Sequence, residues 1–148
     1  MEGLHAMELL GGDDVCASTI RNDLDVHEWL EQGIPNRVLI RFIEQLDELK
    51  QSTSLKKVIG MSLRTIQRRK DGDPEQTLSL EQGNRLWRFA TILAKAKEVF
   101  GSQQEAEYWL DRPAIGLNQR IPMELLATTA GFGIVENYLD RMKWGVYT

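Results

Sequence analysis

Residues 54–70 concentrate positive charge in an otherwise acidic chain, whose formal net charge is −4. Arginine and glutamine side chains can form paired hydrogen bonds with the edges of guanine and adenine in the major groove of DNA. An acidic protein binds DNA only through a local basic face, because its bulk charge repels the phosphates. The sequence therefore predicts a confined DNA-binding surface here. The basic residues of the stretch are Lys56, Lys57, Arg64, Arg68, Arg69 and Lys70.

The spacing within this stretch is typical of two short helices joined by a tight turn, the second of which would enter the major groove. Gly60 suits the left-handed position that ends a helix, and Ser62 suits the N-cap of the next. Leu63 and Ile66 are expected to face inward. The alternative is a solvated helix with surface arginines, and Lys56 stands where the common motif has a small residue. The residues expected to contact DNA are Ser62, Arg64, Thr65, Gln67, Arg68 and Arg69.

No other group of residues indicates catalysis or metal binding. His5 and His27 lie far apart, and Cys16 is the single cysteine, so an internal disulfide is impossible and a reducing cytoplasm is expected. Gly131 and Gly133 lack the pattern of a phosphate-binding loop. The carboxylates of the C-terminal half have no histidine nearby. We therefore expect no enzyme activity, no cofactor and no metal.

The hydrophobic pattern predicts an all-α chain. Of its 148 residues, 42% are hydrophobic and 27% charged, which is typical of a soluble globular protein. No apolar run reaches membrane-spanning length, and no secretory signal is visible. Residues 1–19 are expected to be irregular, and Gly131 and Gly133 to interrupt the chain. Helices are expected at 26–31, from 36 to about 49, and at 55–59, 63–70, 80–100, 103–110, 123–128 and 134–142.

Two apolar features each allow two interpretations. An apolar stripe in the second helix can serve the core alone, or both the core and a dimer interface. The chain end, residues 144–148, is apolar and aromatic where termini are normally polar, so it packs on its own domain or docks into a partner. Trp29, Trp87 and Trp109 are expected in the core. The stripe consists of Val38, Leu39, Phe42, Ile43 and Leu46.

Residues 53–148 resemble the antitoxins of the Xre/MbcA/ParS type, which are partners of RES-domain toxins. Residues 1–52 carry no matching motif. The similar motifs follow one another in the family's order. They are Ser62-Leu-Arg-Thr-Ile-Gln-Arg-Arg69, Arg85-Leu-Trp-Arg-Phe-Ala90, Ala94-Lys-Ala-Lys-Glu-Val-Phe-Gly101, Ala106-Glu-Tyr-Trp-Leu110, Pro122-Met-Glu-Leu-Leu126 and Leu139-Asp-Arg-Met-Lys-Trp-Gly-Val-Tyr147.

The resemblance implies a type II antitoxin that represses its own operon and neutralises a toxin acting on NAD. Residues 1–52 would form a helical region with a possible dimerisation role, 53–100 the helix-turn-helix region, and 101–148 the toxin-binding domain. The expected partners are a RES-domain toxin, operator DNA and a second copy of the chain, with a larger assembly on toxin binding. A stand-alone helix-turn-helix regulator with a C-terminal dimerisation domain is the alternative. In the family the chain end covers the toxin's active site, which here implies Arg141, Lys143, Trp144, Gly145, Val146, Tyr147 and Thr148.

Overall fold

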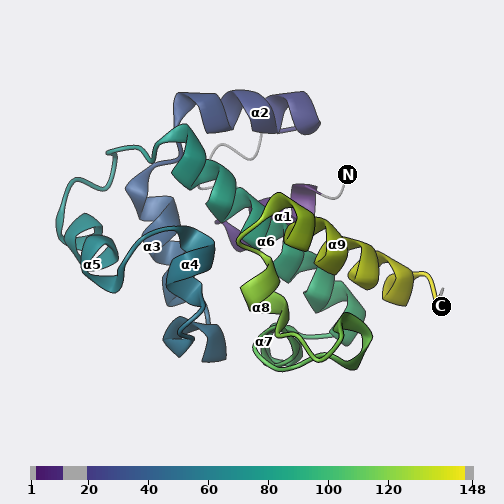
Figure 1. Ribbon diagram of the computed structural model, residues 1–148. Coiled ribbons are helices and arrows are strands. Elements are labelled where there is room, and N and C mark those ends of the chain that lie inside the picture. The colour runs from purple at the N-terminus through teal and green to yellow at the C-terminus, as the bar shows by residue number, and fades with distance from the viewer. Residues whose placement is uncertain (1–2, 12–19, 146–148) are drawn as a thin grey trace.

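A computed structural model describes residues 3–11 and 20–145, and every regular element in those ranges is a helix (Figure 1). Cys16 lies outside the described residues. Extended pairing in the described ranges is limited to single bridges between Pro35 and Thr77 and between Ala114 and Arg120. The predicted all-α class is confirmed. The helices are α1 Gly3–Leu9, α2 Asp23–Gln32, α3 Asn36–Glu44, η3 Glu48–Gln51, α4 Leu55–Ile59, α5 Leu63–Asp71, α6 Leu80–Phe100, α7 Gln103–Leu110, η4 Ile115–Leu117, α8 Pro122–Leu125 and α9 Thr129–Lys143.

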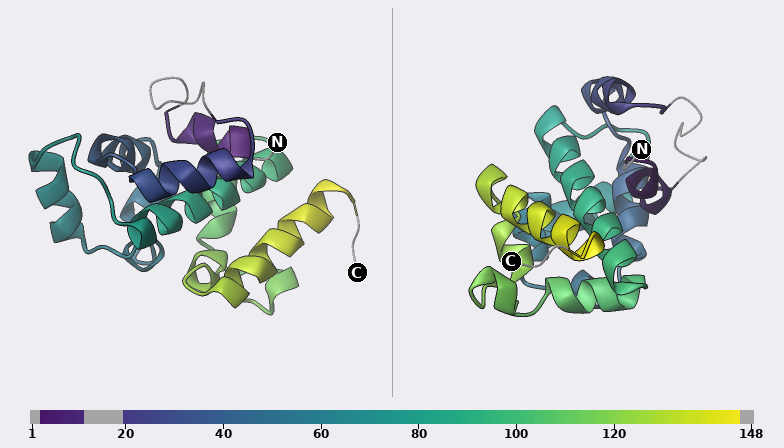
Figure 2. Two further views of the ribbon diagram at one scale, coloured as in Figure 1. Left: turned by 90° about the horizontal axis from the view of Figure 1, so that it is seen from above. Right: turned by 90° about the vertical axis from the view of Figure 1, so that its right-hand side faces the viewer.

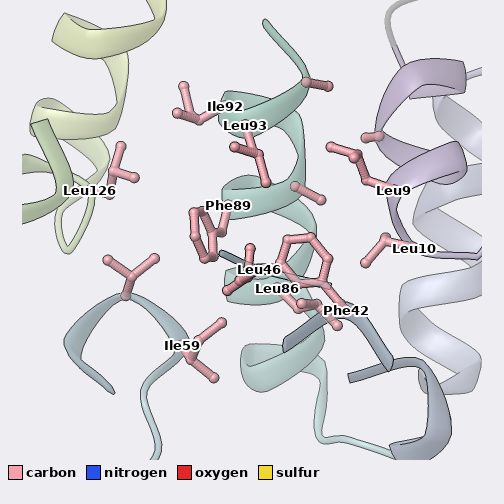
Figure 3. Packing of buried hydrophobic residues seen from close by; sticks show 14 of the residues in the cluster. Leu9, Leu10, Phe42, Leu46, Ile59, Leu86, Phe89, Ile92, Leu93 and Leu126 are labelled. Atoms are coloured by element: carbon pink, nitrogen blue, oxygen red, sulfur yellow. The ribbon is translucent and has the colours of Figure 1, made fainter. Parts of the chain in front are cut away.

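The long helix α6 is the centre of the molecule, with α1, α2, α4, α7 and α9 packed around it (Figures 1 and 2). The predicted capping box at its start is present, with Ser79 and Gln82 bonded reciprocally. Leu86 and Phe89 are fully buried, and Phe42 of α3 meets Phe89 edge-on at a centroid distance of 5.5 Å (Figure 3). One apolar core therefore joins the N-terminal and C-terminal helices.

The first helix corrects the expectation that residues 1–19 are irregular. Ala6, Met7 and Leu10 are buried, and Leu9 and Leu10 point toward α6 (Figure 3). A helix of seven residues is too short to be stable alone, so its stability comes from this packing. A periodic pattern cannot be recognised over so short a segment.

The second expected helix is shorter than predicted. It ends at Glu44, and Leu49 lies in the separate turn η3 rather than in a continuation of α3. All five residues of the apolar stripe are buried within the chain, the most exposed being Ile43 at 8%. The stripe therefore belongs to the core, and a further use of it as a dimer interface is not supported.

The expectation that Gly131 and Gly133 interrupt the chain is also wrong, since both lie in the first turns of α9. The hydroxyl of Thr128 caps this helix by accepting the backbone N–H of Gly131 at 2.9 Å. A Cβ on Gly131 would stand 1.9 Å from the carbonyl oxygen of Leu125. Only glycine fits there, because the end of α8 passes so close. Helix α8 itself ends at Leu125 instead of the predicted Thr128.

The three inner tryptophans lie in the core or against it, as predicted. Trp29 meets Trp87 edge-on at 6.4 Å, and Trp109 stacks on Tyr138 of α9 at 5.8 Å. Apolar packing continues across residues 52–53 and 100–101 without a gap. The division into three regions at those positions stays a prediction.

Candidate functional site

The turn between α4 and α5 has the geometry of a helix-turn-helix. Gly60 ends α4 with φ 79° and ψ 22°, in the left-handed region, and its N–H donates to the carbonyl of Lys56 at 2.8 Å. The hydroxyl of Ser62 accepts the backbone N–H of Thr65 at 3.1 Å, which caps α5. Both predicted capping positions are confirmed. They fix the direction in which α5 leaves the turn.

The helix α5 packs on α3 and carries its polar residues outward. Ile66 is buried, and Lys70 pairs with Glu44 of α3 at 3.2 Å. Leu63, predicted to face inward, is 67% exposed because the first residue of α5 lies beyond the packed surface. It lines an open hollow with Ile43 and Leu55. A single buried apolar residue on α5 therefore holds this helix against the core, and the polar contacts become important for its orientation.

Four of the residues predicted to contact DNA have exposed side chains, and Thr65 is half-exposed. Arg64 and Arg68 make no hydrogen bond or ion pair within the described part of the chain. Gln67 donates to the carboxylate of Asp71 at 3.3 Å, a contact that an adenine edge would have to replace. The outer face of α5 is thus open and basic. Its exposed members are Ser62, Arg64, Gln67 and Arg68.

Arg69 differs from its neighbours because its guanidinium points into the fold. One terminal nitrogen donates to the buried side chain of Asn36 at 2.6 Å, and the other donates to Gln82 at 3.2 Å. Asn36 in turn donates to the carbonyl of Asp73 at 3.2 Å. The prediction that Arg69 contacts DNA is therefore not supported. Its position instead ties α5 to α3 and to the start of α6.

At the C-terminal end, Lys143 is paired and Trp144 is exposed. Lys143 lies 2.8 Å from Glu98 of α6, and the same carboxylate lies 2.8 Å from His5. The hydrogen bond from Lys143 lowers the pKa of Glu98 below its ordinary value. Trp144 is 74% exposed and so does not pack into the core, although Lys143 approaches its ring. Arg141 and Gly145 are also exposed, and the predicted positions Val146, Tyr147 and Thr148 lie outside the described residues.

A buried lysine sets the position of α9, and the sequence analysis missed it. Lys95 is 8% exposed and pairs with Asp140 of α9 at 2.8 Å. Val135 and Leu139 of the same helix are fully buried. The sequence does place a lysine on the apolar side of the long helix and carboxylates on a later helix, which together indicate a buried ion pair. Its distant partner could not be identified from spacing.

The second missed residue is Glu107, a fully buried carboxylate on α7. It accepts the backbone N–H groups of Asp47 and Leu49, each at 2.9 Å, and the side-chain amide of Gln103 at 2.8 Å. Beside it, Ser52 donates to Asp111 at 2.9 Å. These bonds fix η3, which directly precedes α4, against the C-terminal helices.

The described residues contain no group of three His, Cys, Asp or Glu placed to hold a metal ion. Within the same residues, no helix has both the length and the apolarity needed to cross a membrane.

Residues 95–145 match the family described as the antitoxin Xre/MbcA/ParS C-terminal toxin-binding domain. This range runs from the buried Lys95 through α9 to the exposed end, and it defines the C-terminal helices as the toxin-binding part of an antitoxin.

Similar whole chains agree with this match. "Antitoxin Xre" of Pseudomonas putida is 30% identical over 126 residues, which are 85% of this chain and 76% of the relative. Proteins of the same name from Photorhabdus laumondii and Yersinia enterocolitica are 29% and 31% identical over 91 and 90 residues. Those alignments cover 60% of each relative and 61% and 60% of this chain. The chain belongs to the Xre/MbcA/ParS antitoxin family, and it is the antitoxin of a toxin–antitoxin system.

Proposed function

We propose that this antitoxin neutralises a RES-domain toxin that consumes NAD, by inserting its C-terminal tail into the toxin's active-site cleft. The tail is defined as residues 144–148. The observation that carries the proposal is the exposed indole of Trp144 at the end of the toxin-binding domain. An aromatic side chain of this size, left open to water directly after α9, is suited to anchor in a partner's cleft.

The contacts of α9 support this mechanism by holding the base of the tail in place. The pairs of Lys143 with Glu98 and of Lys95 with Asp140 both fix the last turn of α9 on α6. A tail that leaves a fixed helix loses less conformational freedom on binding than one on a mobile helix. Arg141, exposed one turn earlier, would meet the rim of the cleft.

We further propose that the outer face of α5 binds operator DNA and represses the antitoxin's own operon. Arg64 and Arg68 are the candidates for reading guanine edges, and Gln67 for adenine. Ser62 and Thr65, at the start of the helix, would contact phosphates. A homodimer would place two such helices on successive half-sites. Its interface would have to use a surface other than the buried stripe of α3.

The two candidate surfaces lie at opposite ends of the molecule. Both Figure 1 and the left view of Figure 2 place α5 at one side and the C-terminal end of α9 at the other. One copy would therefore hold DNA and toxin at the same time, and toxin binding would not compete sterically for α5.

Deletion of the tail tests the neutralisation mechanism. We expect a variant without residues 144–148 to lose protection when it is co-expressed with the toxin, measured by cellular NAD and growth. Its thermal stability should be retained because Trp144 contributes nothing to the core. Full protection at equal abundance would refute occlusion by the tail.

A further inference from the structure

A hollow of about 210 Å³ lies between α3 and the end of α5, and its charged lining is mainly positive. The described residues that line it include four basic side chains and one carboxylate, that of Glu44. Helix α3 lies directly beside α5 (Figure 1). In a chain of net charge −4, so much positive charge on one small surface is local and is suited to an anion. We define the α3 cradle by its basic residues, Arg37, Arg41, Arg69 and Lys70.

The charge of Arg69 has no carboxylate partner in the described part of the chain. Its terminal nitrogens donate to the neutral amides of Asn36 and Gln82. Its Nε is buried and has no hydrogen-bond partner among the described residues. A cation withdrawn from water is costly unless a counter-charge lies near it. An anion held in the cradle would supply that counter-charge.

Two other cations of the cradle pair with carboxylates that are open to water. Arg37 lies 2.8 Å from the exposed Glu75, and Lys70 lies 3.2 Å from the exposed Glu44. Such pairs contribute little to stability, because water and salt screen them. Arg41, one turn after Arg37, is exposed on the same face of α3. An anion that contacts several of these cations at once can therefore replace the carboxylates as their partner.

We propose that the α3 cradle binds a phosphate of the DNA backbone beside the groove that α5 enters, so that α3 is a second DNA-contacting helix. This inference rests on the proposed function of α5, since it assigns another part of the same duplex to a neighbouring surface. A helix about 10–12 Å across fills a major groove about 12 Å wide, so the phosphate backbones run along both of its flanks. The helix packed on a flank of α5 is α3.

The contact made by the cradle differs in kind from those proposed for α5. Phosphate contacts fix the position of a protein on the duplex but carry no base information, whereas side chains on the outer face of α5 would read base edges. The cradle would therefore add affinity that is independent of DNA sequence and sensitive to salt. It also gives a role to α3, which precedes the family motifs of residues 53–148.

Charge substitutions at the cradle test this contact. In the full chain, Arg41→Ala should raise the Kd about 10-fold for a duplex of the promoter region ahead of this chain's coding sequence, and equally for a duplex of scrambled sequence. The slope of log Kd against log salt should decrease by about 0.9, the value of one phosphate contact. Arg41→Lys should retain most of the slope, because lysine binds phosphate as a point charge. The matched control is Arg120→Ala, an exposed position in the toxin-binding domain, which should change neither quantity.

Glu44→Gln separates phosphate binding from a purely structural role of the cradle. It removes the carboxylate that lines the hollow, so it should lower the Kd for both duplexes several-fold. If the pair of Glu44 with Lys70 only orients α5, this change should weaken binding instead, and that result would overturn the proposal. An unchanged Kd and salt slope for Arg41→Ala would also overturn it, while a loss of binding in Arg68→Ala would leave the role of α5 standing. If the unmodified chain binds neither duplex, the proposed DNA-binding function fails and the cradle fails with it.

Discussion

The buried carboxylate of Glu107 should be among the most important single side chains for stability. It accepts the backbone N–H of Leu49 in a fully buried bond and that of Asp47 in a partly buried one. Glu107→Ala would leave both donors without this acceptor, and the donor of Leu49 is fully buried. A hydrogen bond to a charged group contributes about 1.5–3 kcal/mol, and an unsatisfied buried donor costs a similar amount. Because the bond to Asp47 is only partly buried, the two losses together are expected at the lower end of their range, a decrease of about 3–4 kcal/mol in the free energy of unfolding.

Thermal and urea denaturation followed by circular dichroism would measure this effect. For a chain of this size, 1 kcal/mol lowers Tm by about 2–4 °C, so Glu107→Ala should lower it by roughly 6–16 °C. Glu107→Gln keeps one acceptor oxygen, so its Tm should lie between those of the unmodified protein and Glu107→Ala. Gln104→Ala, at an exposed position of the same helix, is the control and should stay within about 0.5 kcal/mol of the unmodified protein. A Glu107→Ala variant that melts like this control would refute the role given to the carboxylate.

Three further predictions concern α9, acid stability and DNA. Gly131→Ala should destabilise by about 2–4 kcal/mol in urea denaturation, through its clash with Leu125, whereas Gly133→Ala, which has open space, should stabilise slightly through helix propensity. Lys143 lowers the pKa of Glu98 in the folded state, so their pair stabilises the fold above the unfolded-state pKa, and this stabilisation is lost as pH falls through the folded-state pKa. In urea denaturation at stepwise lower pH, the free energy of unfolding of Glu98→Gln should therefore decrease less than that of the unmodified protein. If Arg68 reads guanine, Arg68→Ala should weaken operator binding by about 1–3 kcal/mol. If Arg68 contacts a phosphate instead, the same change should weaken binding to all DNA sequences alike and reduce the salt dependence. Mobility shifts at two salt concentrations separate the two roles.

The sequence was sufficient for features that are encoded locally. Gly60, Ser62 and Ser79 mark helix ends through their own backbone and hydroxyl chemistry, and the structure has all three as predicted. It was insufficient where the surroundings of a residue come from a segment far away in the chain. From the sequence, Gly131 is expected to break a helix, but it lies inside α9, where the end of α8 passes close to it. Arg69 is expected on the surface, but its guanidinium donates to Asn36 inside the fold.

For the candidate surfaces on α5 and α9, the residue types follow from the local sequence, but the orientation of the helices depends on contacts with distant parts of the chain. Hydrophobic packing on α6 brings the helices together, but it is non-directional and leaves their rotation poorly fixed. Short polar contacts on both sides of α6 fix how the neighbouring helices are rotated about their own axes. Arg85 donates to the carbonyl of Lys57 at 3.1 Å, at the end of α4, and Lys95 pairs with Asp140 on α9. The types of residue exposed on α5 and α9 can therefore be read from the sequence. The direction in which they point depends on polar pairs whose members lie tens of residues apart in the chain.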